Sequence, residues 1–97
     1  MAISSESIDV TVYDVSVVDG ILTAYSYVQF DGAYTDPDEI RFRIYTIPQN
    51  NRSSFQGDLF GGKVVKIADG IFKYTEDVSQ LVKGKYDISC EVIFSEP

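Results

Sequence analysis

Residues 81–94 decide the fold, and they read Leu-Val-Lys-Gly-Lys-Tyr-Asp-Ile-Ser-Cys-Glu-Val-Ile-Phe. From Lys85 onward, apolar side chains alternate with charged or hydroxyl side chains, and the apolar set is Tyr86, Ile88, Cys90, Val92 and Phe94. A period of two is typical of a strand with one buried and one solvated face. The pattern predicts a half-buried β-strand whose apolar set faces a core.

The same alternation recurs upstream, in residues 7–18, 21–30, 40–45, 63–68 and 71–75. Asp19-Gly20 and Asp69-Gly70 separate neighbouring segments, and Asp-Gly is a strong hairpin signal. We expect six to seven strands, and one helical turn over residues 77–81 with Asp77 as its N-cap. The predicted inward side chains include Ile8, Val10, Val12, Leu22, Val28, Phe30, Phe42, Ile44, Phe72, Tyr74, Tyr86, Ile88, Cys90 and Val92.

The first predicted strand changes phase along its length. Ile8, Val10 and Val12 share one phase, whereas Val15 and Val17 share the other. Such a change predicts either a β-bulge near Tyr13-Asp14 or a strand that switches sheets.

Short strands joined by Gly and Asp turns favour an antiparallel β-sandwich over helical and α/β classes. The 97 residues have the size of one such domain, so residues 1–97 are expected to form a single unit.

Composition excludes several classes of function. The chain has 8 basic and 15 acidic residues, a net charge of −7, no histidine and one cysteine. An acidic surface repels phosphate, so nucleic acid and membranes are not expected as partners. One cysteine excludes an intrachain disulfide, and Cys90 is expected to be a small buried apolar residue.

Residues 81–89 resemble the E–F corner of fibronectin type III and related immunoglobulin-like domains, where a leucine and a glycine precede a tyrosine that begins an inward-alternating strand. Residues 70–74, Gly-Ile-Phe-Lys-Tyr, are similar to immunoglobulin-like modules of tailed-bacteriophage virion proteins. The resemblance implies an immunoglobulin-like Greek-key sandwich acting as a capsid decoration or as a tail or baseplate accessory. The absence of tryptophan and of a cysteine pair excludes an antibody-type domain.

A complete domain of that kind would add one more strand after the Tyr86 strand. Either the second half of the first strand covers the last strand's edge, or that edge is open. An open edge presents unpaired N–H and C=O groups and invites pairing with another chain.

Two groups of residues are candidates for binding a partner. Tyr25, Tyr27 and Tyr45 take outward phases, with Tyr13 as a further member. Three interpretations stay open for them: packing across the sheet, a protein interface, or a platform for sugars. Residues 48–62 form a long irregular stretch that carries Phe55, Leu59 and Phe60, which either fold back onto the sandwich or dock into a partner.

Acidic residues gather in the connection over residues 31–39. Asp31, Asp36, Asp38 and Glu39 offer oxygens to calcium, but their spacing fits no EF-hand loop, and Asp favours turns by itself. Turn chemistry is the preferred interpretation, so no metal and no cofactor is expected.

Arg41 and Arg43 point outward from the third predicted strand. In an immunoglobulin-like topology this strand lies beside the last one, which predicts a cross-strand ion pair with Glu91.

Enzymatic motifs are absent, and no histidine is available as a general base, so catalysis is not expected. The leading hypothesis is a non-catalytic structural module that attaches to a protein partner in a larger assembly, such as a phage capsid or tail. A homo-oligomer, or completion of an edge strand by another chain, is compatible with it. The rival is a carbohydrate-binding or adhesion module built on the outward tyrosines. The first residues lack a secretory signal, so the expected location is the virion for a phage protein and the cytoplasm otherwise.

Overall fold

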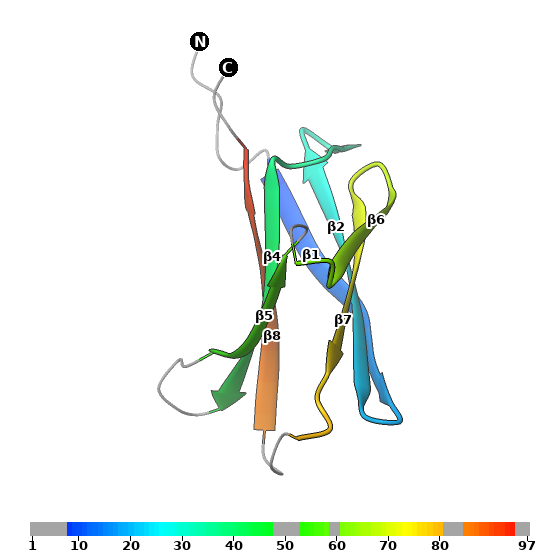
Figure 1. Cartoon of the computed structure of the whole chain (residues 1–97). Coiled ribbons are helices and arrows are strands. Elements are labelled where there is room, and N and C mark those ends of the chain that lie inside the picture. The colour runs from blue at the N-terminus through cyan, green and yellow to red at the C-terminus, as the bar shows by residue number, and fades with distance from the viewer. Residues whose placement is uncertain (1–7, 48–52, 59–60, 81–84, 95–97) are drawn as a thin grey trace.

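The computed structural model describes residues 8–47, 53–58, 61–80 and 85–94 (Figure 1). Their regular secondary structure is entirely β, as predicted. The strands are β1 (Ile8–Val18), β2 (Ile21–Phe30), β3 (Ala33–Tyr34), β4 (Glu39–Ile47), β5 (Ser53–Asp58), β6 (Val64–Ala68), β7 (Ile71–Asp77) and β8 (Lys85–Ile93).

The strands form two antiparallel sheets that lie face to face as a β-sandwich (Figure 1). One sheet has the order β1-β2-β7-β6, with the short β3 also paired to β2, and the other has the order β5-β4-β8. The predicted sandwich is therefore confirmed, as is the pairing of β4 with the last strand, β8.

The prediction that residues 48–62 are irregular is wrong for residues 53–58. These residues form β5, whose backbone pairs with β4 so that Gly57 lies opposite Phe42 and Phe55 lies opposite Ile44. Glycine and aspartate do not favour strands, so local propensity gave no signal for β5. The strand forms because the edge of β4 supplies backbone partners.

The core lies between the sheets, and its fully buried apolar side chains come from β2, β4, β6 and β7. They are Leu22, Ala24, Val28, Ile40, Phe42, Ile44, Val64, Phe72 and Tyr74. Partly buried side chains pack against them from β1, β8 and the flanking turns, namely Val10, Val12, Val78, Tyr86, Ile88, Cys90, Val92 and Phe94. The predicted inward set is confirmed with two exceptions at the end of the sandwich. Ile8 and Phe30 are half-buried but are not among the residues that pack against the core, although the Phe30 ring meets Phe94 edge-on at 5.6 Å.

The phase change in β1 is a β-bulge, which confirms the first of the two predicted explanations. The register with β2 shifts between Tyr13 and Ser16, and Asp14 has a φ of 50°. Aspartate tolerates this left-handed conformation better than most residues. Both halves of β1 pair with β2, so the strand does not switch sheets and its second half does not cover the edge of β8.

The predicted helical turn after β7 is not formed by the described residues. Asp77 is instead the last residue of β7, and residues 79–80 form a turn. The Asp77 carboxylate accepts hydrogen bonds from the backbone N–H and the hydroxyl of Ser79, at 3.0 and 2.6 Å. An Asx turn offers the same acceptor as a helix N-cap, so the sequence signal for the two is shared.

Gly70 joins the β6–β7 turn to the rest of its sheet. Its N–H donates to Oδ1 of Asp36 at 2.8 Å, and its carbonyl accepts from the Val28 N–H at 2.7 Å. Its φ is +69°, and an added Cβ would lie 2.7 Å from backbone atoms of Thr35 and Val28. Both the conformation and the space at this position therefore require glycine.

We expect Gly70→Ala to destabilise the fold more than Gly32→Ala. Gly32 has a similar φ of +81°, but nothing lies within 4 Å of its added Cβ. Gly32→Ala should therefore cost about 1 kcal/mol of unfolding free energy from backbone strain, and Gly70→Ala about 1–3 kcal/mol more from the clash. Urea unfolding of both variants measures the difference, and equal losses would contradict the packing argument.

Glu76 is a buried acid that the sequence did not single out. Its side chain lies on the inner side of β7, where Oε1 accepts a hydrogen bond from the Tyr74 hydroxyl at 2.7 Å. Lys63 Nζ reaches the same carboxylate at 2.8 Å and is half exposed. Burial, followed by this contact with Glu76, raises the pKa of Tyr74. The cluster therefore keeps Tyr74 as a neutral donor to a charged acceptor.

Removing that donor should weaken the fold. Tyr74→Phe keeps the ring in the core but withdraws one hydrogen bond from the buried Glu76 carboxylate, which should cost about 1–3 kcal/mol of unfolding free energy. Tyr34→Phe is the matched control because Tyr34 is exposed, and it should change stability by less than about 0.5 kcal/mol. Thermal or urea unfolding compares the two, and a neutral Tyr74→Phe would show that water replaces the hydroxyl.

Candidate interaction surface

Four tyrosines gather on the outer face of the five-stranded sheet. The Tyr13 ring lies 5.7 Å from Tyr25 and 6.0 Å from Tyr27, and Tyr27 lies 6.0 Å from Tyr34. We call this set, Tyr13, Tyr25, Tyr27 and Tyr34, the tyrosine face. The rings form one continuous aromatic row that crosses β1, β2 and β3.

The strand registers explain why these rings meet. Tyr13 lies opposite Tyr25 in the β1–β2 pair, and Tyr34 lies opposite Gln29 in the β2–β3 pair. All of these residues hold the phase opposite to buried Ala24, Ser26 and Val28. Cross-strand aromatic neighbours stabilise a sheet, so part of the row's role is to hold β1 on β2.

Tyr45 does not belong to this row, which corrects the predicted grouping with Tyr25 and Tyr27. It lies on β4, in the other sheet. Alternation within a strand gives the phase of a side chain but not the sheet to which the strand belongs. The row includes Tyr13, as predicted, and gains Tyr34, which was not predicted.

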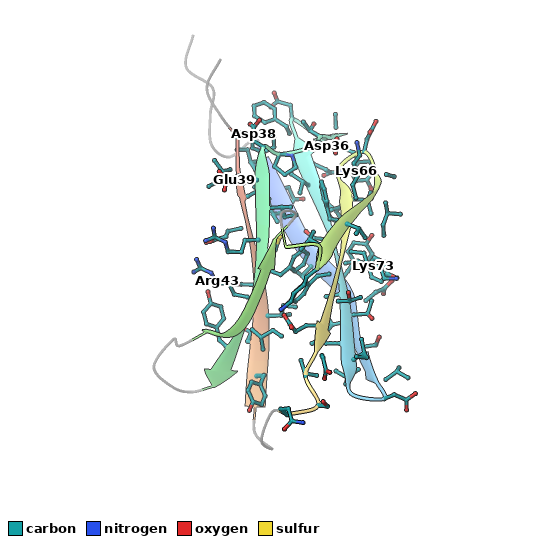
Figure 2. The ribbon with its side chains drawn as sticks, in the orientation of Figure 1. Asp36, Asp38, Glu39, Arg43, Lys66 and Lys73 are labelled. Carbon is teal, nitrogen blue, oxygen red and sulfur yellow. The ribbon has the colours of Figure 1, made fainter. Side chains whose placement is uncertain are left out.

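The row continues across β7 and β6 with a cation and an aliphatic residue. Lys73 lies opposite Tyr25 on β7, and Val65 lies opposite Lys73 on β6. Val65 is 50% exposed and Tyr34 is 53% exposed. Figure 2 shows Lys73 and Arg43 pointing away from opposite sides of the sandwich. No ion pair of Lys73 occurs among the described residues, so its charge is available beside the aromatic row.

The outer face of the three-stranded sheet is polar by comparison. Arg43 and Arg41 lie 3.0 and 3.5 Å from Oε1 of Glu91, which confirms the predicted ion pairs. Hydrogen bonds with Ser89 and then Arg43 lower the pKa of Tyr45. Arg41, Arg43 and Glu91 of this face are therefore engaged with one another, whereas the tyrosine face presents rings and aliphatic side chains.

The other predicted partner-binding residues lie largely beyond what the structure describes. Leu59 and Phe60 are outside the described residues. Phe55 lies on β5, and its backbone is paired with Ile44. Their docking role stays a prediction.

The four acidic calcium candidates have different local environments. Asp36 accepts hydrogen bonds from Lys66 Nζ and from the Gly70 N–H, which in that order hold its pKa below the usual value. Asp31 has a φ of 53° in a turn, and Glu39 lies on β4 opposite Ile93. The Asp38 N–H donates to the Ile93 carbonyl. Figure 2 labels Asp36, Asp38 and Glu39. In the described ranges no group of three or more acidic, cysteine or histidine residues is placed to hold a metal ion.

Comparison with known proteins identifies no relative: no protein-family model, curated protein or solved structure matches the chain. The part of the chain that the structure describes contains no helix long and apolar enough to cross a membrane.

Several features of the structure were within reach of the sequence and others were not. Glu76 keeps the phase of Phe72 and Tyr74, so the alternation already placed it inward. Tyr34 stands in a polar connection, and only its pairing with Gln29 brings it to the row. Lys73 and Val65 are neighbours of the tyrosines only through the β2–β7–β6 order.

Cys90 is half-buried on the inner side of β8, and its burial raises the pKa of the thiol to about 11. Since the thiolate is the reactive form, alkylation by iodoacetamide at pH 8 should be about 100-fold slower in the folded chain than in urea. The rate should rise as pH approaches 11 if the fold persists there. Equal rates in the folded and unfolded chain at pH 8 would contradict the environment given to Cys90.

Proposed function

We propose that this chain is a non-catalytic interaction module that attaches to a larger assembly through the tyrosine face. The observation that carries the proposal is the outward aromatic row, with Tyr34 exposed and the other three rings partly exposed, beside Val65 and Lys73 on one sheet. Tyrosine is enriched in protein interfaces because its ring buries a large area while its hydroxyl keeps a hydrogen bond. Apolar surface gathered on one face marks an interaction site more often than scattered residues do.

The proposal includes an immunoglobulin-like fold. The order β1-β2-β7-β6 facing β5-β4-β8 agrees with strands A, B, E and D facing C′, C and F of such a sandwich. The similarity of residues 70–74 to modules of tailed phages makes a capsid decoration, or a tail or baseplate accessory, our specific assignment. Because this fold has many functions, the surface and not the fold must decide the role.

The carbohydrate-binding alternative is weaker on geometric grounds. Neighbouring rings in the row are inclined to one another by 28°, 41° and 72°. A platform that stacks on successive sugar rings needs aromatic planes that face solvent in common. The changing inclination instead suits rings that pack on each other and present edges to a protein.

The proposal predicts loss of attachment when the row is truncated. The measurement is co-sedimentation with large assemblies from its source, such as capsids or tails, with which the unmodified chain should pellet. Tyr25→Ala/Tyr27→Ala should bind these assemblies at least tenfold more weakly, because central aromatic residues dominate interface energies. Arg41→Ala is the control, since Arg41 lies on the other sheet. Attachment that survives the double substitution would contradict the proposal.

The same variants separate the alternative. A glycan array should give no signal for the unmodified chain. Binding to a defined glycan that disappears in Tyr25→Ala/Tyr27→Ala would replace the proposed function by sugar recognition. Circular dichroism of each variant checks that the fold is retained.

A further inference from the structure

The two long sides of the sandwich differ in how far the core is closed. At the side of β6 and β5, Val64 is 2% exposed and Gly57 is buried beside the Tyr74 ring. At the side of β1 and β8, the inner residues of both strands are only partly buried. The inner residues of β4, which neighbours β8, are fully buried by contrast.

The bulge in β1 adds to the uncovered apolar surface on that side. After the bulge Val17 lies opposite Leu22, so it shares the inner face with a residue that is 8% exposed. Val17 itself is 56% exposed, and Val15, two residues earlier, is 47% exposed. On the opposite side of the sandwich the inner residues are covered by neighbouring strands. The exposure of an inner-facing valine therefore indicates that no such covering element lies over it among the described residues.

β8 also has a backbone edge without a strand. In its sheet β8 pairs with β4 on one side, and none of the described strands pairs on the other. The Ile93 carbonyl accepts from the Asp38 N–H and therefore faces β4. Alternation then directs the backbone groups of Cys90 and Val92 to the open edge. The Ile88 N–H, on the same edge, donates to Oδ1 of Asp87 at 2.8 Å.

The strand on the other edge of β8 indicates what side chains suit an added strand. β4 runs Ile40-Arg41-Phe42-Arg43-Ile44, with apolar residues in the core and arginines outward. Those arginines contact Glu91 of β8. Asp87 also points outward from β8 and is exposed, and it has no ion pair among the residues that the structure describes.

We propose that the open edge of β8 binds an extended segment of a partner protein in which aliphatic residues alternate with lysine or arginine. The segment pairs with the backbone of Cys90 and Val92. Its aliphatic side chains cover the inner residues of β8 and β1, and its cations lie near Asp87 and Glu91. Addition of a strand to a sheet edge is a recurrent mode of peptide recognition.

Charge favours such a partner over a second copy of this chain. A second copy carries the same net charge of −7, and pairing two β8 strands brings a second Asp87 and Glu91 to the same edge. Like charges on neighbouring strands are destabilising. The backbone edge that the segment pairs with belongs to β8, in the sheet opposite the tyrosine face, and the β1 residues that it covers point inward, away from that face. The two proposals therefore stand or fall separately.

Amide exchange resolved by residue tests the state of the edge. In the free chain, the amides of Cys90 and Val92 should exchange much faster than those of Ser89 and Glu91, which face β4. Protection of Cys90 and Val92 that is independent of protein concentration would overturn the proposal, because the chain itself would then cover the edge. Protection that grows with concentration would assign the edge to a second copy and overturn the partner.

Binding is tested with synthetic nine-residue peptides in which valine alternates with arginine. The peptide should slow exchange at Cys90 and Val92 and leave Ser89 and Glu91 unchanged. A peptide with glutamate in place of arginine, and one with a central proline, should bind at least tenfold more weakly. Equal binding of all three peptides would overturn the proposal.

Two substitutions at Asp87 provide a charge test that a structural role would not reproduce. Asp87→Lys should weaken binding of the arginine peptide about threefold to tenfold and strengthen binding of the glutamate peptide. Asp87→Asn keeps an acceptor for the Ile88 N–H and should weaken binding of the arginine peptide without weakening binding of the glutamate peptide. Glu39→Lys, on the β4 strand, is the matched control and should change neither affinity. An arginine peptide that binds Asp87→Lys as well as the unmodified chain would overturn the placement of its cations.

Discussion

The structure depends on one contact across its interior, the stacking of Tyr74 on Phe42. The two rings lie 5.0 Å apart and 11° from parallel, and each is fully buried. Phe42 belongs to the central strand of one sheet and Tyr74 to an inner strand of the other, so this pair holds the sheets in register. Gly57 makes room for it, since an added Cβ would lie 2.6 Å from the Tyr74 ring.

The same residue fixes the polar interior at the β5–β6 side. The Tyr74 hydroxyl donates a hydrogen bond to Glu76, and Glu76 forms an ion pair with Lys63, whose side chain is half exposed to solvent. A buried carboxylate is tolerated only when donors surround it, so the stack and the ion pair depend on one another. This side is therefore closed by specific contacts, whereas the β1–β8 side offers only half-buried aliphatic residues.

Alternation in the sequence predicted the layers well because burial imposes a period of two on every strand. The inner sets of β2, β4 and β7 and the bulge at Asp14 follow from phase and turn chemistry. The ion pairs of Glu91 needed, besides phase, the pairing of β4 with β8 that the resemblance implied. Alternation failed where pairing partners decide the outcome. β5 is a strand because β4 is beside it, and Tyr45 is separated from Tyr25 because their strands belong to different sheets. The aromatic row was therefore predictable as a set of outward tyrosines but not in its membership.

The two exposed surfaces have different physical character, and this determines what each can recognise. The tyrosine face consists of side chains whose backbones are already paired within the sheet, so it can select a partner only by shape, aromatic contact and the charge of Lys73. The edge of β8 with which none of the described strands pairs offers backbone groups that an extended segment can satisfy. Selectivity at that edge must come from the acidic outward residues and the aliphatic inner ones. Asp87 accepts a hydrogen bond from one edge donor, the Ile88 N–H, which limits indiscriminate strand pairing. Its exposed negative charge favours a basic segment. Taken together, the two proposals describe a module that would hold two partners at once, one selected by side chains and one by charge, as a connecting component of an assembly requires.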